Sequence, residues 1–432
     1  MTLARTARAT LVAGALAVAC PRAATATPPP SVCNRSYKAE KSGLDPHRYE
    51  LAGFPIIGGN TDIGVQFGGA ATLTRFCGDV QPYQWNIDLL LSASAKDDSS
   101  GLRLVQQSHV LRLDAPALFG GRVRVDGRLN YLRTINAGYY GLGNDSSAAL
   151  PPGVTDPGRR FQYLQQEGRA RFITRIHTSS PLDLALGLNL RYESPGVYDG
   201  SRLAADALAQ NREGDPRVRG LDPAAIAGVA AGVMYDTRDT EFVTTKGIFY
   251  QLGVGASAGS SDGIGYGDTS AVLSHYAPLP GPFIFASRLV ASFQFGNVPF
   301  YDLMQGGTFE PQYLFGGETG VRGVPDGRYA GKVKLVTNIE IRSRFPRFQL
   351  LGQRLRIGTT TFLDAGRLWD EYSYDPGSDG RKLGLKYGVG GGFFLQWGEA
   401  AIFRIEAAYS PDAVAENPGF PIGLYVSDGL MF

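Results

Sequence analysis

The chain has 432 residues, including 57 glycine, 23 phenylalanine and 21 tyrosine residues, and only 19% of its residues are charged. Glycine averages about 7% of residues in proteins, and a chain rich in glycine and aromatic residues but poor in charge is typical of an all-β protein. A net charge of +2 offers no basic surface for nucleic acid, so we expect no nucleic-acid partner. Beyond the N-terminus, the absence of apolar runs of about 18 residues excludes membrane-spanning helices but not membrane-spanning strands.

The N-terminus has the pattern of an export signal. Arg5 and Arg8 precede an apolar stretch at 10–20, and Ala-Thr-Ala at 24–26 is a small-residue cleavage site. We therefore expect residues 1–26 to be a signal peptide. The alternative is a lipoprotein signal in which Cys20 is acylated.

Residues 27–48 form a short, proline-rich segment, which we expect to be a periplasmic lead-in rather than a domain. After export, Cys33 in this segment and Cys77 near the first strands would lie in an oxidising compartment, where a disulfide is favoured. The alternative is two free, buried thiols.

From residue 49 to residue 432 the sequence alternates between apolar and polar residues, which places one set of side chains on each face of a sheet. Many of the alternating segments span 10–14 residues, longer than the roughly 5–6 residues usual in soluble sandwiches. The predicted strands are 49–57, 62–74, 84–94, 102–113, 120–133, 160–177, 182–194, 226–237, 247–257, 265–277, 282–293, 332–345, 355–365, 384–396, 400–410 and 423–432.

The connections between these segments alternate in length. The long ones, 134–159, 195–225, 295–331 and 366–383, all follow odd-numbered strands, while those after even-numbered strands are mostly short. Short periplasmic turns alternating with long external loops are typical of outer-membrane barrels. We therefore expect residues 49–432 to form a 16-stranded antiparallel transmembrane β-barrel in contact with outer-membrane lipid.

Several motifs then resemble a family. The segment 316–323 reads Gly-Gly-Glu-Thr-Gly-Val-Arg-Gly, 362–366 reads Phe-Leu-Asp-Ala-Gly, and 236–239 reads Asp-Thr-Arg-Asp. These segments resemble the BamA/TamA-type outer-membrane proteins, also called the bacterial surface antigen family. The resemblance covers nearly all of the expected mature chain, and 140–144 is similar to a further external-loop segment of that family.

The resemblance implies that the sixth external loop, the one between the eleventh and twelfth predicted strands, folds into the lumen. Its motif residues are Gly317, Val321 and Gly323 in the loop and Phe362 and Gly366 in the barrel wall.

Arg322 is the residue expected to tether this loop. Alternation points Asp364 into the lumen, and the resemblance implies that Arg322 binds it; Glu406, which stands where an aspartate is more common, is a further expected partner. The alternative is that Arg322 is a solvated loop residue.

The C-terminal Phe432, with Gly429 before it, is similar to the assembly signal of outer-membrane barrels. We therefore expect the last strand to be recognised by the outer-membrane assembly machinery. Family members that insert or translocate proteins carry POTRA repeats before the barrel, and residues 27–48 are too few for one repeat.

Three functions fit these observations: an assembly or translocation factor, a passive pore or surface antigen on the same scaffold, and, ranked last, an outer-membrane hydrolase. The four histidines, His47, His109, His177 and His275, lack the spacing of metal ligands. Ser274 and His275 are adjacent on a predicted strand and so point to opposite faces. We therefore expect no enzyme activity, cofactor or metal.

Overall fold

The computed structural model describes most of the chain from residue 47 onward. The described residues are 47–60, 63–78, 80, 82–98, 101–147, 157–179, 181–211, 214–241, 243–350, 353–397, 401–415 and 421–432. The expected signal peptide at 1–26, Cys20 and Cys33 lie outside them. Among the helices in the described ranges, none is long and apolar enough to cross a membrane.

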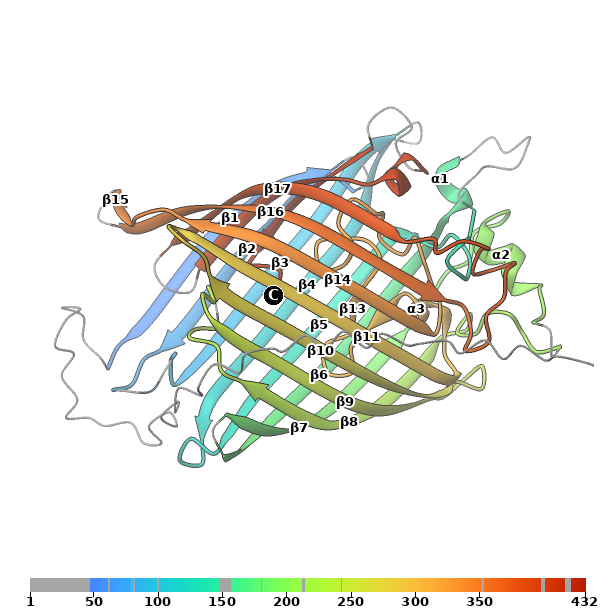
Figure 1. Ribbon diagram of the computed structural model, residues 1–432. Coiled ribbons are helices and arrows are strands. Elements are labelled where there is room, and N and C mark those ends of the chain that lie inside the picture. Colours follow the sequence, from blue (N-terminus) through green and yellow to red (C-terminus); the bar gives the residue numbers. More distant parts are fainter. Residues whose placement is uncertain are drawn as a thin grey trace, which may run out of the picture.

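One antiparallel sheet contains almost all of the strands and curls around a central space (Figure 1). It has 17 strands, of which β15 (Phe348–Leu350) is a three-residue extension beside β16. The other strands are β1 (Tyr49–Asn60), β2 (Gly64–Arg75), β3 (Trp85–Asp98), β4 (Gly101–Leu118), β5 (Val123–Gly138), β6 (Gln162–Ser179), β7 (Leu182–Glu193), β8 (Ala224–Asp236), β9 (Gly247–Gly259), β10 (Gly265–Pro278), β11 (Phe283–Asn297), β14 (Val333–Arg344), β16 (Gln353–Trp369), β17 (Lys386–Trp397), β18 (Ala401–Tyr409) and β19 (Ile422–Asp428). Each of the predicted strands corresponds to one of these, which confirms the all-β antiparallel fold.

The sheet has an apolar outer face and a polar inner face, as its alternating sequence predicts. On β14, Leu335 and Ile339 are exposed, whereas Asn338 and Glu340 are buried on the inner side. Leu363 and Asp364 on β16 show the same contrast. Since an apolar exterior suits lipid and a polar interior suits a lumen, this is the pattern of a membrane-spanning sheet.

The two ends of the sheet are not joined. β1 pairs with β2 and β19 pairs with β18, and no pairing between β1 and β19 occurs among the described residues. Pro55 in β1 has no N–H to donate, and Gly53 contributes no side chain, so β1 is poorly suited to the interior of a sheet. Within the part of the chain that the structure describes, each end strand therefore keeps an unpaired edge.

The C-terminus differs from the sequence-based expectation. The last strand was predicted over 423–432, but β19 ends at Asp428, and Gly429 adopts a positive φ of 77° that turns the chain out of the strand. Arg342 then donates a hydrogen bond of 2.9 Å to the carbonyl oxygen of Phe432, and the Phe432 ring lies 5.3 Å from the Arg288 guanidinium. Phe432 therefore lies inside the sheet rather than at the end of its last strand.

The connection between β11 and β14 also lies inside the sheet (Figure 1). It contains the one-turn helix α3 (Phe300–Leu303) and the short strands β12 (Gln305–Gly306) and β13 (Gln312–Tyr313), and we call residues 298–332 the inner loop. A buried cluster joins this loop to the inner wall; it comprises Leu314, Phe315, Val321, Val324 and Tyr329 with Val290, Val336 and Leu368. The other helices are α1 (Pro157–Arg160), α2 (Arg202–Ala207) and the 3₁₀ helix η1 (Pro411–Ala415).

Cys77 is buried and disulfide-bonded. Its expected partner, Cys33, lies outside the described residues, so the Cys33–Cys77 pairing stays a prediction.

Candidate functional site: an arginine that holds the inner loop

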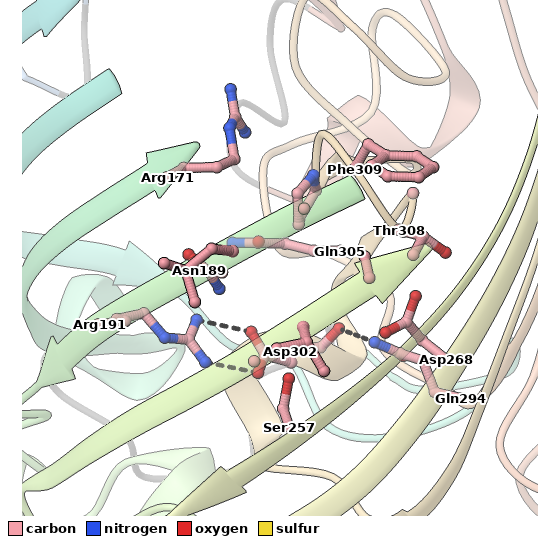
Figure 2. Close-up of a pocket in the computed structure, with 18 of the residues that line it drawn as sticks. Arg171, Asn189, Arg191, Ser257, Asp268, Gln294, Asp302, Gln305, Thr308 and Phe309 are labelled. Carbon is pink, nitrogen blue, oxygen red and sulfur yellow. Dashed lines mark hydrogen bonds and ion pairs between the residues drawn. The ribbon is translucent and has the colours of Figure 1, made fainter. Parts of the chain in front are cut away.

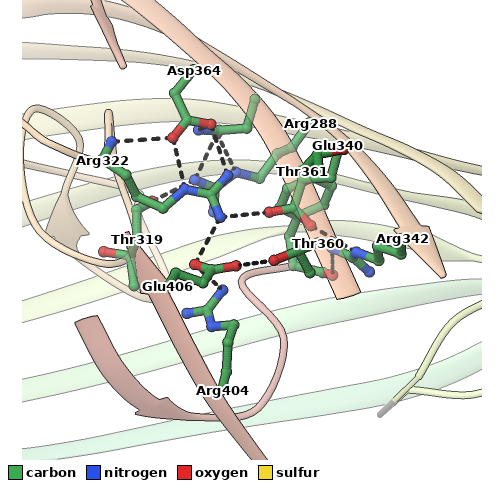
Figure 3. Close-up of polar contacts among 12 residues, drawn as sticks. Arg288, Thr319, Arg322, Glu340, Arg342, Thr360, Thr361, Asp364, Arg404 and Glu406 are labelled. Atoms are coloured by element: carbon green, nitrogen blue, oxygen red, sulfur yellow. Dashed lines mark hydrogen bonds and ion pairs between the residues drawn. The ribbon is translucent and has the colours of Figure 1, made fainter. Parts of the chain in front are cut away.

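Arg322 of the inner loop lies against the inner face of the wall. Its Nε donates to Oδ2 of Asp364 at 2.7 Å, its Nη2 to Oδ1 at 2.9 Å, and its backbone N–H to Oδ2 at 3.1 Å (Figure 3). Both side chains are fully buried. This is a two-pronged guanidinium–carboxylate contact, the geometry in which arginine binds a carboxylate most specifically.

The remaining nitrogen of the same guanidinium, Nη1, lies close to two further carboxylates. Nη1 of Arg322 lies 2.7 Å from Oε1 of Glu340 and 3.0 Å from Oε2 of Glu406. The guanidinium also sits over the ring of Phe362, with its central carbon 3.4 Å from the ring centroid. One loop residue is therefore held by β14, β16 and β18 at once.

The register of the strands brings these groups together. Asn338 of β14 is opposite Asp364 of β16, and Glu340 is opposite Phe362. Glu406 of β18 is opposite a glycine of β17, Gly392, so no side chain separates it from Thr360 of β16, which donates to it at 2.7 Å. Because all of these residues share the inner face, they converge on a single point.

The charges around Arg322 are balanced by further arginines. Arg342 pairs with Glu340 at 2.7 Å, Arg404 lies 3.5 Å from Glu406, and Arg288 donates to Asn338 at 3.0 Å (Figure 3). Burial alone would lower the pKa of Arg322, but the carboxylates of Glu340 and Asp364 outweigh it and hold that pKa well above its ordinary value. Arg322 is therefore permanently charged and paired.

A glycine in the wall lets the loop backbone come this close. Gly388 of β17 is opposite Asp364, and a Cβ atom at this position would overlap the carbonyl oxygen of Arg322. In the loop itself, Gly323 has a φ of 91°, which disfavours any residue with a side chain. Its N–H donates at 2.7 Å to the hydroxyl of Tyr425, which connects the loop to the last strand.

The other motif residues lie at the same place. Gly317 has a φ of 70°, and Val321 is fully buried, with its N–H bonded to the carbonyl of Leu314 at 3.1 Å. A Cβ at Gly366 would come within 2.9 Å of the Phe315 ring. The structure thus brings together Arg322, Asp364 and Glu406 with the loop and wall motif residues. Gly429 and Phe432, the expected assembly signal, lie at the chain end described above.

A second anchor holds the start of the inner loop. Arg191 of β7 donates through Nη1 and Nη2 to the two oxygens of Asp302 in α3 at 2.7 and 2.6 Å (Figure 2). The hydroxyl of Tyr266 also donates to Asp302, at 2.6 Å. Burial alone would raise the pKa of Asp302, but the adjacent Arg191 guanidinium outweighs burial and lowers it. Asp302 is therefore a buried carboxylate held by two strands.

Sequence reasoning missed part of this site. The sequence pattern does not single out Glu340, Asn338, Arg191 or Asp302. Alternation marks Glu340 and Asn338 as inward, and the strand register then sets them beside Asp364; that register was the missing information. Nothing in the sequence pattern links Arg191 to Asp302, 111 residues away.

Ser274 is buried on the inner face, whereas His275 points outward, where its ring contacts the hydroxyl of Tyr250. Within the described residues, no group of three or more His, Cys, Asp or Glu side chains is arranged to hold a metal ion.

The fold and this site together define a class of protein: a membrane-spanning β-sheet protein with an arginine-anchored loop on its inner side. A family model described as the Omp85 superfamily domain matches residues 106–418, well over half of the chain. The chain therefore belongs to the Omp85 superfamily. The family and the fold indicate a bacterial outer membrane and confirm the resemblance to BamA/TamA-type barrels.

Solved structures show the same fold. BamA from Haemophilus ducreyi lacking POTRA domains 1–3 is similar with a TM-score of 0.51 at 15% identity, covering 89% of this chain and 70% of that one. CdiB from Escherichia coli is similar with a TM-score of 0.53 at 14% identity, covering 90% of this chain. The chain spans 63% of the length of that CdiB structure. Among curated proteins, none matches the sequence significantly.

Proposed function

We propose that this protein assists the insertion or translocation of other polypeptides at the outer membrane. The observation that carries the proposal is the pair of unpaired edges on β1 and β19 in the described residues. An unpaired strand edge presents a row of N–H and C=O groups that another strand can bind by β-augmentation. A client strand is the natural occupant of such an edge.

The inner loop supports this role over that of a wide passive pore. It fills part of the space inside the sheet and is held there by Arg322 and Asp302. Its contact from Gly323 to Tyr425 reaches β19, one of the two strands with an open edge. The inner loop is therefore in direct contact with a strand whose edge is open. Such a contact suits a protein that inserts or translocates polypeptides better than one that only conducts solutes.

The proposal includes a route to the outer membrane and contacts within it. The chain would be exported by the signal peptide at 1–26, and residues 27–48 would be a periplasmic lead-in. The outer-membrane assembly machinery would recognise the C-terminal segment with Gly429 and Phe432, and the outer apolar face would contact lipid. The role is non-enzymatic and needs no cofactor.

Folding of a client in vesicles tests the proposal. The full-length protein is reconstituted in phospholipid vesicles, and a urea-unfolded, eight-stranded outer-membrane barrel is added as the client. Folding is followed by the heat-modifiable gel shift. A photo-crosslinking residue replaces Leu51 on β1 or Val426 on β19, and a matched residue replaces Leu186 in the middle of the paired wall; all three side chains are exposed on the outer surface, at 78%, 76% and 51%.

The proposal predicts faster client folding than in empty vesicles and crosslinks to the client at Leu51 or Val426 but not at Leu186. Unchanged folding together with ion conductance across the vesicle membrane would instead identify a passive pore. Equal crosslinking at all three positions would show that the open edges are not the binding place, and would overturn the proposal.

A further inference from the structure

The inner face of β4 to β7 carries a group of arginines, most of which are paired. Five of them have a carboxylate oxygen at 2.6–3.2 Å: these pairs are Arg112–Asp126, Arg124–Asp114, Arg169–Glu167, Arg175–Asp183 and Arg191–Asp302. This is the usual condition of an arginine inside a protein, because an unpaired buried charge is unfavourable.

Arg128 and Arg171 do not meet this condition. Arg128 has no ion pair or hydrogen bond within the described residues, and its Nε is buried without a partner. The Nε of Arg171 is likewise buried without a partner, and the single ion pair of this side chain among the described residues is a 3.8 Å contact to Glu310, which is 66% exposed. Within the described residues, the Nε donors of these two side chains therefore lack an acceptor.

These two arginines are direct neighbours across the strands. Arg128 of β5 is opposite Arg171 of β6, so two like charges face each other on the inner side. Like charges directly opposite in a sheet are destabilising, and buried donors without acceptors add to that. A bound anion would remove both problems at once.

Arg171 borders a small cavity, whose lining does not include Arg128. Arg171 and Asn189, which is opposite it on β7, line a cavity of about 60 Å³ under residues 305–309 of the inner loop (Figure 2). This volume has room for a few water molecules or a small ion beside Arg171. A guanidinium group binds phosphate or carboxylate oxygens through paired hydrogen bonds. Two guanidinium groups on facing residues, Arg128 and Arg171, therefore suit an anion with several oxygens.

We propose that Arg128 and Arg171 form a binding site for a small oxyanion of the phosphate class on the inner face of the sheet. Each guanidinium donates to the oxyanion, which neutralises the repulsion between β5 and β6. The site is separate from the strand edges and does not depend on the proposed handling of polypeptides.

Calorimetric titration of the full-length protein in detergent with inorganic phosphate tests the site. The variants are Arg128→Gln, Arg171→Gln and the double variant. The matched control is Arg175→Gln, which removes a paired arginine from the same face of the same strand. Each variant is first shown to be folded by its heat-modifiable gel shift.

The wild-type protein should bind phosphate saturably at one site, while chloride at equal ionic strength should not compete. The double variant should bind about tenfold more weakly or not at all, and Arg175→Gln should stay within about twofold of wild type. Absence of phosphate binding by the wild type, or equal binding by the double variant, would overturn the proposal. Binding of an acidic peptide but not of phosphate would overturn it as well, since it would assign the arginines to a polypeptide.

Discussion

Arg322 donates three hydrogen bonds to Asp364, two from its guanidinium and one from its backbone N–H. The side chain and the main chain of one loop residue are thus fixed by one carboxylate of the wall. Because the backbone bond survives removal of the guanidinium, the two partners are not equivalent. Loss of Asp364 removes all three bonds, whereas loss of the Arg322 side chain removes the cation shared by Asp364, Glu340 and Glu406, of which Glu340 keeps Arg342 and Glu406 keeps Arg404.

The first prediction concerns this pair. Arg322→Ala and Asp364→Ala should each lower stability by about 3–5 kcal/mol, because each removes one partner of a fully buried ion pair. The double variant should be less destabilised than the sum of the two, since neither residue then lacks its partner. Chemical unfolding followed by the gel shift measures all three, and additive effects would show that the residues are not coupled.

Exchange of the two charges is a sharper test of the whole cluster. In Arg322→Asp combined with Asp364→Arg, the introduced carboxylate would face Glu340 and Glu406. We therefore expect no recovery relative to Asp364→Ala. Recovery close to wild-type stability would mean that Glu340 and Glu406 do not contribute to the site.

The second prediction concerns Gly388. In Gly388→Ala the added methyl would overlap the carbonyl oxygen of Arg322, so the loop or β17 must shift, at a cost of about 1–3 kcal/mol. Gly168→Ala on β6 is the control, because a methyl there meets nothing within 4 Å. Protease cleavage within the inner loop should rise for Gly388→Ala and stay at the wild-type level for Gly168→Ala.

The third prediction concerns the second anchor. Asp302→Asn should free α3 from Arg191, because the amide cannot accept both guanidinium bonds and leaves a buried arginine charge unbalanced. Limited proteolysis with mass spectrometry should find new cleavage near 298–306. Glu310→Gln is the control, since that side chain is exposed and its ion pair with Arg171 is long, at 3.8 Å. Equal cleavage in both variants would argue against the anchor.

The fourth prediction concerns pH and the turn between β8 and β9. Glu241 is exposed, and the guanidinium of Arg124, whose Nη1 lies 2.6 Å away, lowers the pKa of Glu241 from 4.5 to about 2. A carboxyl whose pKa is lowered on folding contributes stability above its ordinary pKa and loses that contribution as the pH falls. The turn should therefore detach between about pH 4.5 and about pH 2.

Pepsin cleavage of residues 237–246 measures this detachment. Cleavage should rise steeply over that pH window in the wild type, after correction for the activity of pepsin on an unstructured peptide. In Glu241→Gln the turn should be cleaved at every pH tested. A wild-type profile that matches the variant would show that the ion pair does not hold the turn.

Much of the fold could be predicted because period-two alternation and loop lengths carry the information directly. Alternation along the strand predicts that Asp364 points into the lumen. The family motif around Arg322 predicts that Arg322 binds it. Glu340 has the same parity as Lys334, Asn338 and Arg342, so alternation alone could not show which of these side chains lies level with the loop. The register of β14 against β16 decides that.

The end of the last strand shows a different limit. Leu424 and Val426 are exposed on the outer face, and the apolar residues after Gly429 continue a pattern that is compatible with a strand to residue 432. The turn at Gly429 comes from its backbone conformation, which many glycines in the middle of other strands do not share. Contacts of Phe432 with Arg288 and Arg342 then hold the tail inside.

Hydrogen exchange in lipid nanodiscs tests the central claim, that Arg322 fixes the inner loop inside the sheet. In residues 314–324, the N–H groups of Val321, Arg322 and Gly323 are bonded to Leu314, Asp364 and Tyr425. We predict that this segment exchanges nearly as slowly as β14 in the wild type, and at least about tenfold faster in Arg322→Ala, with β14 unchanged. Fast exchange of residues 314–324 in the wild-type protein would contradict the claim.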